Sequence, residues 1–175
     1  MRLFVGAFAP PDVAAAIRGA VAGLDARVPV AEDIHLTLHF LGETDDAAVP
    51  GITAALEREV ARRSEVPLWI RGTGAFPDFE RARVLWIGVE EAGVAGRLLD
   101  LARAVGNAES PWTPHLTVAR PRRRRHLEVP EPFRALRFDL PWTLAEVHLA
   151  ASHPAPEGSA RYRSIARFRL RPESL

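Results

Sequence analysis

The sequence predicts a fold in which α-helices and β-strands are mixed. Apolar residues recur at helical spacing in some segments, and as short runs or strand-like alternations in others. A second observation concerns the tripeptide His-Leu-Thr, which occurs at 35–37 and again at 115–117, each time after a predicted helix and a short loop. A unit repeated in this way often packs about a pseudo-twofold axis. We therefore expect one domain, or two small lobes that share a core, with an internal duplication.

Four elements are predicted in the first part of the chain. Residues 2–8 form a buried strand because they are largely apolar. A helix starts at Pro10, since proline is favoured in a first turn. Residues 35–41 form a strand of apolar, aromatic and threonine residues, and a second helix follows a cap at Asp45 or Asp46. Both helices have apolar residues at helical spacing: Val13, Ile17, Val21 and Leu24 in the first, and Ile52, Leu56 and Val60 in the second.

The remaining elements complete the duplicated plan. Residues 66–72 and 82–90 are predicted strands, and the segment 73–81 between them is predicted to be a loop because it holds Gly, Pro and two Phe. A third helix is expected at 93–106, followed by the second His-Leu-Thr strand. Three further strands are predicted from their composition: 134–139, 144–151 and 161–170.

The composition narrows the class of protein. Hydrophobic residues make up 47% and charged residues 26% of the 175 residues, which is the balance of a globular protein. The sequence holds no apolar run of about 18 residues, so we expect no membrane span. It contains no cysteine, which excludes disulfides, thiol catalysis and cysteine-ligated zinc. This is compatible with the reducing cytoplasm, where we expect the protein. The net charge of +1 does not by itself predict nucleic-acid binding, although all 23 basic residues are arginine.

The two His-Leu-Thr strands each present an imidazole and a hydroxyl on one face. Residues two apart on a strand point to the same side, so His35 lies with Thr37 and His115 lies with Thr117. The alternate residues are expected to point into a core: Leu36, Leu38, Phe40, Leu116 and Val118. A strand pattern alone explains these apolar positions. It does not explain why histidine occurs in both copies.

Two imidazoles and two hydroxyls suit the acid–base cleavage of a phosphodiester. A neutral imidazole takes a proton from water and a protonated one gives a proton to the leaving oxygen. Threonine hydroxyls donate to phosphate oxygens as negative charge builds. A metal site is the competing interpretation, because His35 and His39 share a predicted strand face. They are four residues apart, however, which is roughly 13 Å along a strand. We therefore expect no metal and no other cofactor.

The paired motifs resemble those of the 2H phosphoesterase superfamily. Several segments resemble its bacterial and archaeal branch, the RNA 2′,3′-cyclic phosphodiesterases, also called 2′-5′ RNA ligases. These segments are "MRLFVGAFAPPDV", "DIHLTLHFLGE", "FPDFERARVLWIGV", "WTPHLTVARP" and "YRSIARFRL". The resemblance extends over nearly the whole chain, and the two histidine motifs in this order are its most specific part.

The resemblance implies a bilobal α+β fold over residues 1–175, in which two antiparallel sheets surround a central groove and helices cover their outer faces. It implies metal-independent hydrolysis of an RNA 2′,3′-cyclic phosphate end to a 2′-phosphate. His35 and His115 match the catalytic pair, and Thr37 and Thr117 match phosphate-binding threonines. Arg120 matches a phosphate-binding arginine, although its odd offset from His115 requires a bend in the strand. The branch implies that His35 protonates the departing 3′-oxygen and that His115 activates water. The sequence itself leaves these two roles open.

Other residues suggest how a substrate is held. Phe76 and Phe79 are candidates for stacking on the terminal base, and burial at a lobe interface is the alternative for Phe76. The arginine cluster at 122–125 either contacts RNA phosphates or is simply solvated. The expected partner is RNA with a 2′,3′-cyclic phosphate end or a cyclic mononucleotide, and the expected state is a monomer. Two other functions stay open: hydrolysis of a different small cyclic nucleotide phosphate, and RNA binding without catalysis.

Overall fold

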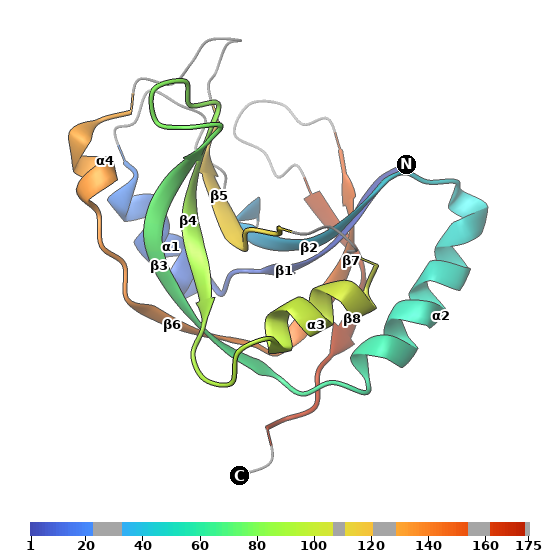
Figure 1. The fold of residues 1–175 in the computed structure, drawn as a ribbon. Helices are drawn as coiled ribbons and strands as arrows, with labels where there is room; N and C mark the ends of the chain where they lie inside the picture. Colours follow the sequence, from blue (N-terminus) through green and yellow to red (C-terminus); the bar gives the residue numbers. More distant parts are fainter. Residues whose placement is uncertain (23–32, 107–110, 121–128, 154–161, 174–175) are drawn as a thin grey trace.

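The computed structural model describes residues 1–22, 33–106, 111–120, 129–153 and 162–173. Within these ranges the strands form a single eight-stranded sheet, in the order β6-β3-β4-β5-β2-β1-β7-β8, and all pairs are antiparallel. Figure 1 shows that the sheet is strongly curled. The strands are β1 (Arg2–Phe8), β2 (His35–Glu43), β3 (Val66–Phe76), β4 (Val84–Glu91), β5 (His115–Ala119), β6 (Leu140–Leu144), β7 (Glu146–Ser152) and β8 (Tyr162–Arg169).

The three predicted helices are present in the predicted order, and a fourth, short helix follows them. Asp45 caps a short 3₁₀ turn, η2 (Asp46–Ala48), because its carboxylate accepts a hydrogen bond from the Ala47 amide at 3.1 Å. That turn leads directly into the second predicted helix. The helices are α1 (Pro11–Ala20), α2 (Val49–Val60), α3 (Arg97–Ala104) and α4 (Glu131–Ala135). Among the described residues, none of these helices is long and apolar enough to cross a membrane.

Two predicted boundaries and one predicted strand were wrong. The strand expected at 66–72 continues to Phe76, because the Gly- and Phe-containing segment keeps pairing with β4. Helix α3 begins at Arg97 rather than at residue 93. The Glu91 carboxylate fixes this start by accepting hydrogen bonds from the amides of Gly96 and Leu98, both at 2.6 Å. The strand predicted at 134–139 is absent from the described structure, where α4 and an irregular segment precede β6.

The sheet consists of two four-stranded halves. The expectation of two separate antiparallel sheets was wrong for the described residues, which form one continuous sheet. We call β2-β1-β7-β8 the His35 half and β6-β3-β4-β5 the His115 half. Within the sheet, a single register pair, Leu36 with Leu116, joins the two halves. The junction is therefore narrow, and it lies within the two His-Leu-Thr strands.

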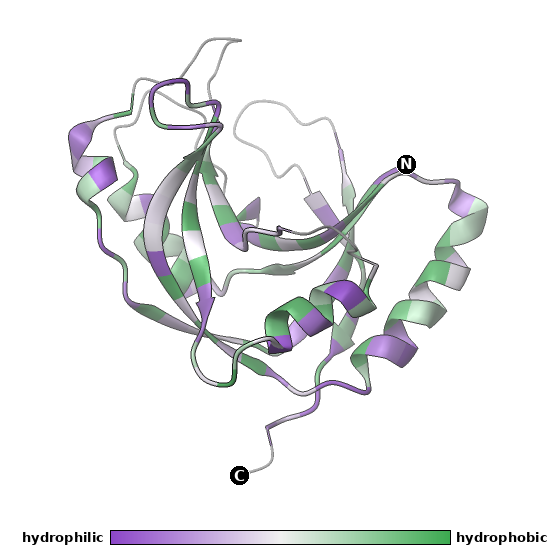
Figure 2. Ribbon diagram, viewed as in Figure 1, coloured by the Kyte–Doolittle hydropathy of each residue, from purple (hydrophilic) through white to green (hydrophobic). Residues whose placement is uncertain are grey.

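One hydrophobic core lies between the sheet and the helices. It includes residues from β1, β2, β4, β5 and the apolar faces of the helices. Leu36 and Leu116 are fully buried in it, as the alternation of both strands predicts. Helix α2 contacts β8, α3 contacts β2, and α4 contacts β3. Figure 2 shows hydrophobic and hydrophilic residues mixed along α2 and α3, as expected for amphipathic helices that each cover one part of the core.

Candidate active site

The junction between the halves brings both His-Leu-Thr motifs into one cleft. Because β2 and β5 are antiparallel about Leu36 and Leu116, His35 lies beside Thr117, and Thr37 lies beside His115. The cleft has a volume of about 220 Å³. Its lining residues come from both halves: Arg2, Leu3, Phe4, His35, Thr37, Phe40, His115, Thr117, Arg120, Ser152 and Tyr162.

Both histidines are held by the same local hydrogen bond. The Nδ1 atom of His115 bonds the carbonyl oxygen of Thr113 at 2.8 Å, and Nδ1 of His35 bonds the carbonyl oxygen of Asp33. A carbonyl only accepts, so Nδ1 carries the proton in each ring. In the neutral form Nε2 is then the nitrogen that remains free to take a proton. The duplicated strand thus fixes the same tautomer twice.

Aromatic rings enclose His35. The rings of Phe4, Tyr162 and Phe8 lie 4.7, 4.8 and 5.7 Å from its imidazole, measured between ring centroids. Burial lowers the pKa of His35 from 6.5 to about 4, and the positive charge of Arg120 acts in the same direction. His35 is consequently neutral at physiological pH in the free protein.

His115 has fewer aromatic neighbours. Phe76 lies 5.0 Å and Trp86 5.9 Å from its ring. Burial also lowers the pKa of His115, and the charge of Arg120 contributes to this shift. A single arginine therefore influences both imidazoles, as expected for groups that share one small cleft.

A β-bulge follows the threonine in each copy. In β2, Thr37 pairs with Gly6 and His39 pairs with Val5, so Leu38 has no partner across the strand pair. In β5, Val118 is the corresponding extra residue, between Thr117 and Ala119. Each bulge shifts the alternation of side chains by one position. The residue five places after each histidine therefore returns to the cleft face.

These bulges explain Arg120 and correct the prediction for Phe40. The bulge at Val118 supplies the bend that the odd offset of Arg120 required, and Arg120 lines the cleft. The equivalent position in the first copy is Phe40. We predicted a core position for Phe40, but 69% of its surface is exposed and it also lines the cleft. Simple alternation fails there because it does not allow for the extra residue.

The same shift separates His39 from His35. His39 pairs with Val5, which is fully buried and points away from the cleft. The imidazole of His39 lies near Gly106, where an added Cβ atom would come within 3.0 Å of it. The two histidines are therefore on opposite faces of β2 and do not form a metal pair. No group of three or more His, Asp or Glu residues within the described ranges is arranged to hold a metal ion.

A second cavity, which we call the aromatic pocket, adjoins the cleft on the His115 side. It has a volume of about 500 Å³, and three of its residues, Thr37, Phe40 and His115, also line the cleft. The others are Leu38, His39, Phe76, Gly106, Pro111, Trp112 and Thr113. Phe76 thus lines the pocket that adjoins the cleft. Phe79 lines neither cavity, because it packs against the core with the Arg134 guanidinium 5.0 Å from its ring centroid.

Three cleft residues with polar side chains, outside both motifs, were not found from the sequence. Arg2, Ser152 and Tyr162 come from β1, β7 and β8, far from either motif in the chain. The backbone amide of Tyr162 donates a hydrogen bond to the buried Asp33 carboxylate at 3.3 Å. This bond links the start of β8 to the residue whose carbonyl holds His35. For Arg2 alone the sequence holds an indication: it lies at an even spacing from Phe4 and Phe8 in β1 and so shares their face. The arginine cluster at 122–125 lies outside the described residues.

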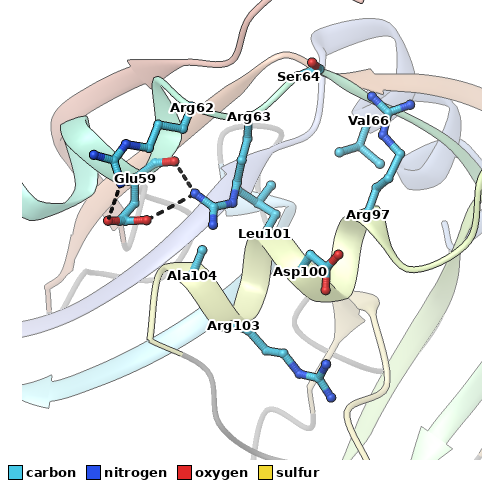
Figure 3. Close-up of a pocket in the computed structure, with 10 residues that line it drawn as sticks. All are labelled: Glu59, Arg62, Arg63, Ser64, Val66, Arg97, Asp100, Leu101, Arg103 and Ala104. Atoms are coloured by element: carbon cyan, nitrogen blue, oxygen red, sulfur yellow. Dashed lines mark hydrogen bonds and ion pairs between the residues drawn. The ribbon is translucent and has the colours of Figure 1, made fainter.

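A larger cavity, of about 660 Å³, lies between α2 and α3 (Figure 3). It shares no residue with the cleft, and its lining contains no histidine. Two of its four arginines are already well bonded. Arg63 donates to the Glu59 backbone and side chain, and Arg97 pairs with Glu173 at 2.6 Å. We therefore place the candidate active site in the cleft, despite its smaller volume.

Comparison with known proteins identifies the family. The family model described as the 2′-5′ RNA ligase superfamily matches residues 9–155. An RNA 2′,3′-cyclic phosphodiesterase of Thermus thermophilus is 31% identical over 188 aligned positions, which cover 99% of this chain and 92% of the relative. One from Archaeoglobus fulgidus is 30% identical, covering 71% of this chain and 74% of the relative. One from Aquifex aeolicus is 34% identical, but the match spans only 52% of its length and 51% of this chain.

Solved structures have the same fold. A crystal structure of a Thermus thermophilus protein superposes with a TM-score of 0.80 at 28% identity, covering 99% of this chain and 100% of that one. The structure of Escherichia coli LigT complexed with 3′-AMP has a TM-score of 0.74 at 24% identity, with 97% and 98% coverage. The curled sheet and its helices are thus shared over essentially the full length.

Proposed function

Because this chain belongs to the 2′-5′ RNA ligase superfamily, we propose that it hydrolyses RNA 2′,3′-cyclic phosphate ends to 2′-phosphates by two-histidine acid–base catalysis. One observation carries the proposal. His35 and His115 line a single cleft, and each Nδ1 is tied to a backbone carbonyl in the same way. The names of the Thermus and Archaeoglobus relatives support the choice of substrate.

The surrounding groups suit a phosphate that gains charge during the reaction. The hydroxyls of Thr37 and Thr117 donate hydrogen bonds to its non-bridging oxygens. Arg120 adds a charged and planar donor pair from the same cleft. The two imidazoles move the protons, each contributing about 10²–10⁴ in rate. This scheme uses no metal ion at any step.

We further propose that residues 1–175 are one bilobal domain that arose by internal duplication. The sheet order supports this proposal, because the two His-Leu-Thr strands are neighbours at its centre and a four-stranded half extends to each side. Each half also contains the series strand, helix, His-Leu-Thr strand: β1-α1-β2 in one and β4-α3-β5 in the other. The groove between two such lobes would be the cleft.

Phosphorus NMR tests the proposed activity. The substrate is an RNA oligomer that ends in a 2′,3′-cyclic phosphate, incubated with the protein in the presence of EDTA. We expect the cyclic phosphate signal to be replaced by that of a 2′-phosphate. A 3′-phosphate product contradicts the proposed regiochemistry, and loss of activity on adding EDTA contradicts metal independence.

The same assay separates the other two functions. A protein that binds RNA without catalysis leaves the cyclic phosphate signal unchanged. A hydrolase of a different small cyclic phosphate turns over a cyclic mononucleotide but not the RNA end.

A further inference from the structure

The cavity between α2 and α3, which we call the α2–α3 cavity, is a second place in the molecule that is suited to a ligand. Its volume of about 660 Å³ falls within the range of about 300–1,000 Å³ that is typical of small-molecule sites. It shares no lining residue with the cleft or with the aromatic pocket. A ligand bound there would therefore be separate from the reaction proposed for the cleft.

Arginine side chains reach this cavity from two sides. Arg62 and Arg63 follow the end of α2 and lie on one side of the cavity, and α3 forms the other side (Figure 3). Helix α3 contributes Arg97 at its start and Arg103 near its end. Between the two sides lies the buried side chain of Leu101. The lining thus combines an apolar centre with arginines from both helical segments.

The lining has an excess of positive charge. Its four arginines outnumber its two carboxylates, Glu59 and Asp100, whereas the whole chain has a net charge of only +1. Glu59 also pairs with Arg58, which lies outside the lining, at 3.4 Å. The hydrogen bond from Arg63 lowers the pKa of Glu59, so this carboxylate is ionised and already paired. The charge that is left over favours an anionic ligand.

Two of the four arginines have a structural role that explains their position. Arg63 donates hydrogen bonds to the backbone carbonyl and the carboxylate of Glu59, and so satisfies a carbonyl in the last turn of α2. Arg97 pairs with Glu173 and donates to the Glu65 carbonyl, both at 2.6 Å. These bonds account for Arg63 and Arg97 without any ligand.

The other two arginines have no comparable partner. The one ion pair of Arg62 among the described residues, with Glu59, is 3.9 Å long, and 67% of the Arg62 side chain is exposed. The Arg103 side chain forms no hydrogen bond or ion pair with any residue that the structure describes. Asp100 lies three residues from both Arg97 and Arg103, a spacing at which helical side chains can pair, yet within the described ranges it pairs with neither. One guanidinium group from each side is thus available to a ligand.

The chemistry of arginine indicates the class of ligand. A guanidinium group presents paired N–H donors that match the oxygens of a phosphate. Available donors on both sides of the cavity suit a molecule that carries phosphate at more than one point. We propose that the α2–α3 cavity binds a small polyphosphate, either inorganic or part of a nucleotide, with Arg62 and Arg103 as its main donors. This proposal does not depend on the activity proposed for the cleft.

Such a ligand would connect the two halves of the molecule. Helix α2 follows β2 of the His35 half, and α3 precedes β5 of the His115 half. A polyphosphate that contacts both Arg62 and Arg103 bridges these helical segments at a distance from the cleft. Because it binds the folded protein, it should also raise the temperature of unfolding.

Isothermal titration calorimetry on the full chain tests the binding. We expect the Kd for inorganic tripolyphosphate to be at least about tenfold lower than that for orthophosphate, because more than one phosphate group is bound. At about 100 times its Kd, tripolyphosphate should raise Tm by about 5–10 °C. Equal Kd values for the two anions would overturn the proposal. Titration with ATP identifies the source: a lower Kd than for tripolyphosphate supports a nucleotide ligand, and an equal or higher one supports an inorganic ligand.

Substitutions in the lining test the location. Arg62→Gln and Arg103→Gln should each raise the Kd for tripolyphosphate by about tenfold or more, because a charged hydrogen bond is lost. Asp100→Asn removes a repelling charge and should lower the Kd by about two- to fivefold. Arg169→Gln is the matched control, since Arg169 has an ion pair of similar length, 3.8 Å to Glu146, and lines none of the three cavities. An unchanged Kd in both lining arginine variants would overturn the proposal.

Two further measurements separate this cavity from other anion sites. Arg120→Met, which changes the arginine of the cleft, should leave the Kd for tripolyphosphate unchanged. If it raises that Kd while Arg62→Gln does not, the anion binds in the cleft and the proposal is wrong. An RNA oligomer with a 3′-hydroxyl end should not displace tripolyphosphate at an equal concentration of phosphate groups. Displacement would show that this surface contacts RNA rather than a small ligand.

Discussion

The His35 half and the His115 half have the same backbone at the site and different surroundings. In both, the histidine Nδ1 bonds a carbonyl two residues earlier, and a bulge after the threonine returns the fifth residue to the cleft. That fifth residue is Phe40 in one half and Arg120 in the other. The duplicated backbone places matched groups around one cleft, and the unmatched side chains give those groups different surroundings.

The difference extends to the residues behind each histidine. Asp33, whose carbonyl holds His35, is 4% exposed and bonds the start of β8, whereas Thr113, its counterpart in the His115 half, is exposed. Burial is therefore deeper in the His35 half. A symmetric backbone with asymmetric packing thus gives two identical side chains different environments.

The largest expected effect tests whether the halves act as one unit. His35→Ala and His115→Ala should each lower kcat by about 10²–10⁴, and the double variant should lose little more than the worse single variant. Phosphorus NMR or chromatography of the products measures the rates. His153→Ala, which changes an exposed histidine outside both cavities, is the control. Losses that multiply in the double variant would show that the two histidines act independently.

A smaller effect distinguishes the halves by pH. The pKa of His35 is about 4 in the folded protein and near 6.5 when unfolded, so the unfolded chain binds more protons between these values. Stability is then highest above pH 6.5 and falls towards pH 4, with a slope of up to about 1.4 kcal/mol per pH unit.

Urea unfolding at pH 7.5, 6 and 5 measures that slope. His35→Leu should remove this part of the pH dependence. His115→Leu should remove a smaller part of the same sign, because burial lowers the pKa of His115 too. Equal slopes for the wild type and His35→Leu would contradict the greater burial of the His35 half.

Phe40 and Arg120, each five positions after a cleft histidine, provide the third test. Under the proposed function, Arg120→Met removes a charged hydrogen-bond donor to the phosphate. Such a bond is worth about 1.5–3 kcal/mol, so kcat/KM should fall by about 10- to 150-fold. Phe40→Met keeps an apolar side chain and should cost less. Steady-state kinetics with a cyclic nucleotide gives both values. If the two substitutions cost the same, the two positions are equivalent in function as well as in backbone.

The smallest effect concerns the support of His115. A Cβ atom added at Gly74 would lie 2.1 Å from the Trp86 ring, which packs against His115 and Phe76. Gly74→Ala should therefore destabilise the fold by about 1–3 kcal/mol, seen as a lower Tm in thermal unfolding. Gly51→Ala on α2 meets no atom within 4 Å and should stabilise slightly, by up to about 1 kcal/mol. A Gly74→Ala variant as stable as the wild type would show that Trp86 is free to move.

Local patterns predicted most of the strands, and they predicted which side chains of each motif share a face. Alternation placed His35 with Thr37 and His115 with Thr117, and the cleft contains all four. It failed at His39 and Phe40, because the bulge at Leu38 adds one residue and inverts the positions that follow it. The same device in β5 explains Arg120, whose offset from His115 had pointed to a bend.

Residues brought in by sheet order were not predictable from local patterns. Arg2, Ser152 and Tyr162 reach the cleft because β1, β7 and β8 lie side by side next to β2. That order is a long-range property that no window of sequence contains. Phe79 illustrates the opposite error, since composition favoured a stacking role while tertiary packing places its ring beneath Arg134.

The single pair between Leu36 and Leu116 makes the boundary between β2 and β5 the most sparsely paired one in the described sheet. Elsewhere in the sheet neighbouring strands pair along several residues, but β2 and β5 pair at one position. The halves are also joined where the backbone of Arg171, after β8, bonds that of Arg63 and Glu65, before β3. A ligand that contacts both His35 and His115 spans this boundary and adds a noncovalent link between β2 and β5. When the two halves are pulled apart, the force needed to separate them should therefore be higher for the ligand-bound protein than for the empty one. Ligand binding would then raise the mechanical stability of the fold.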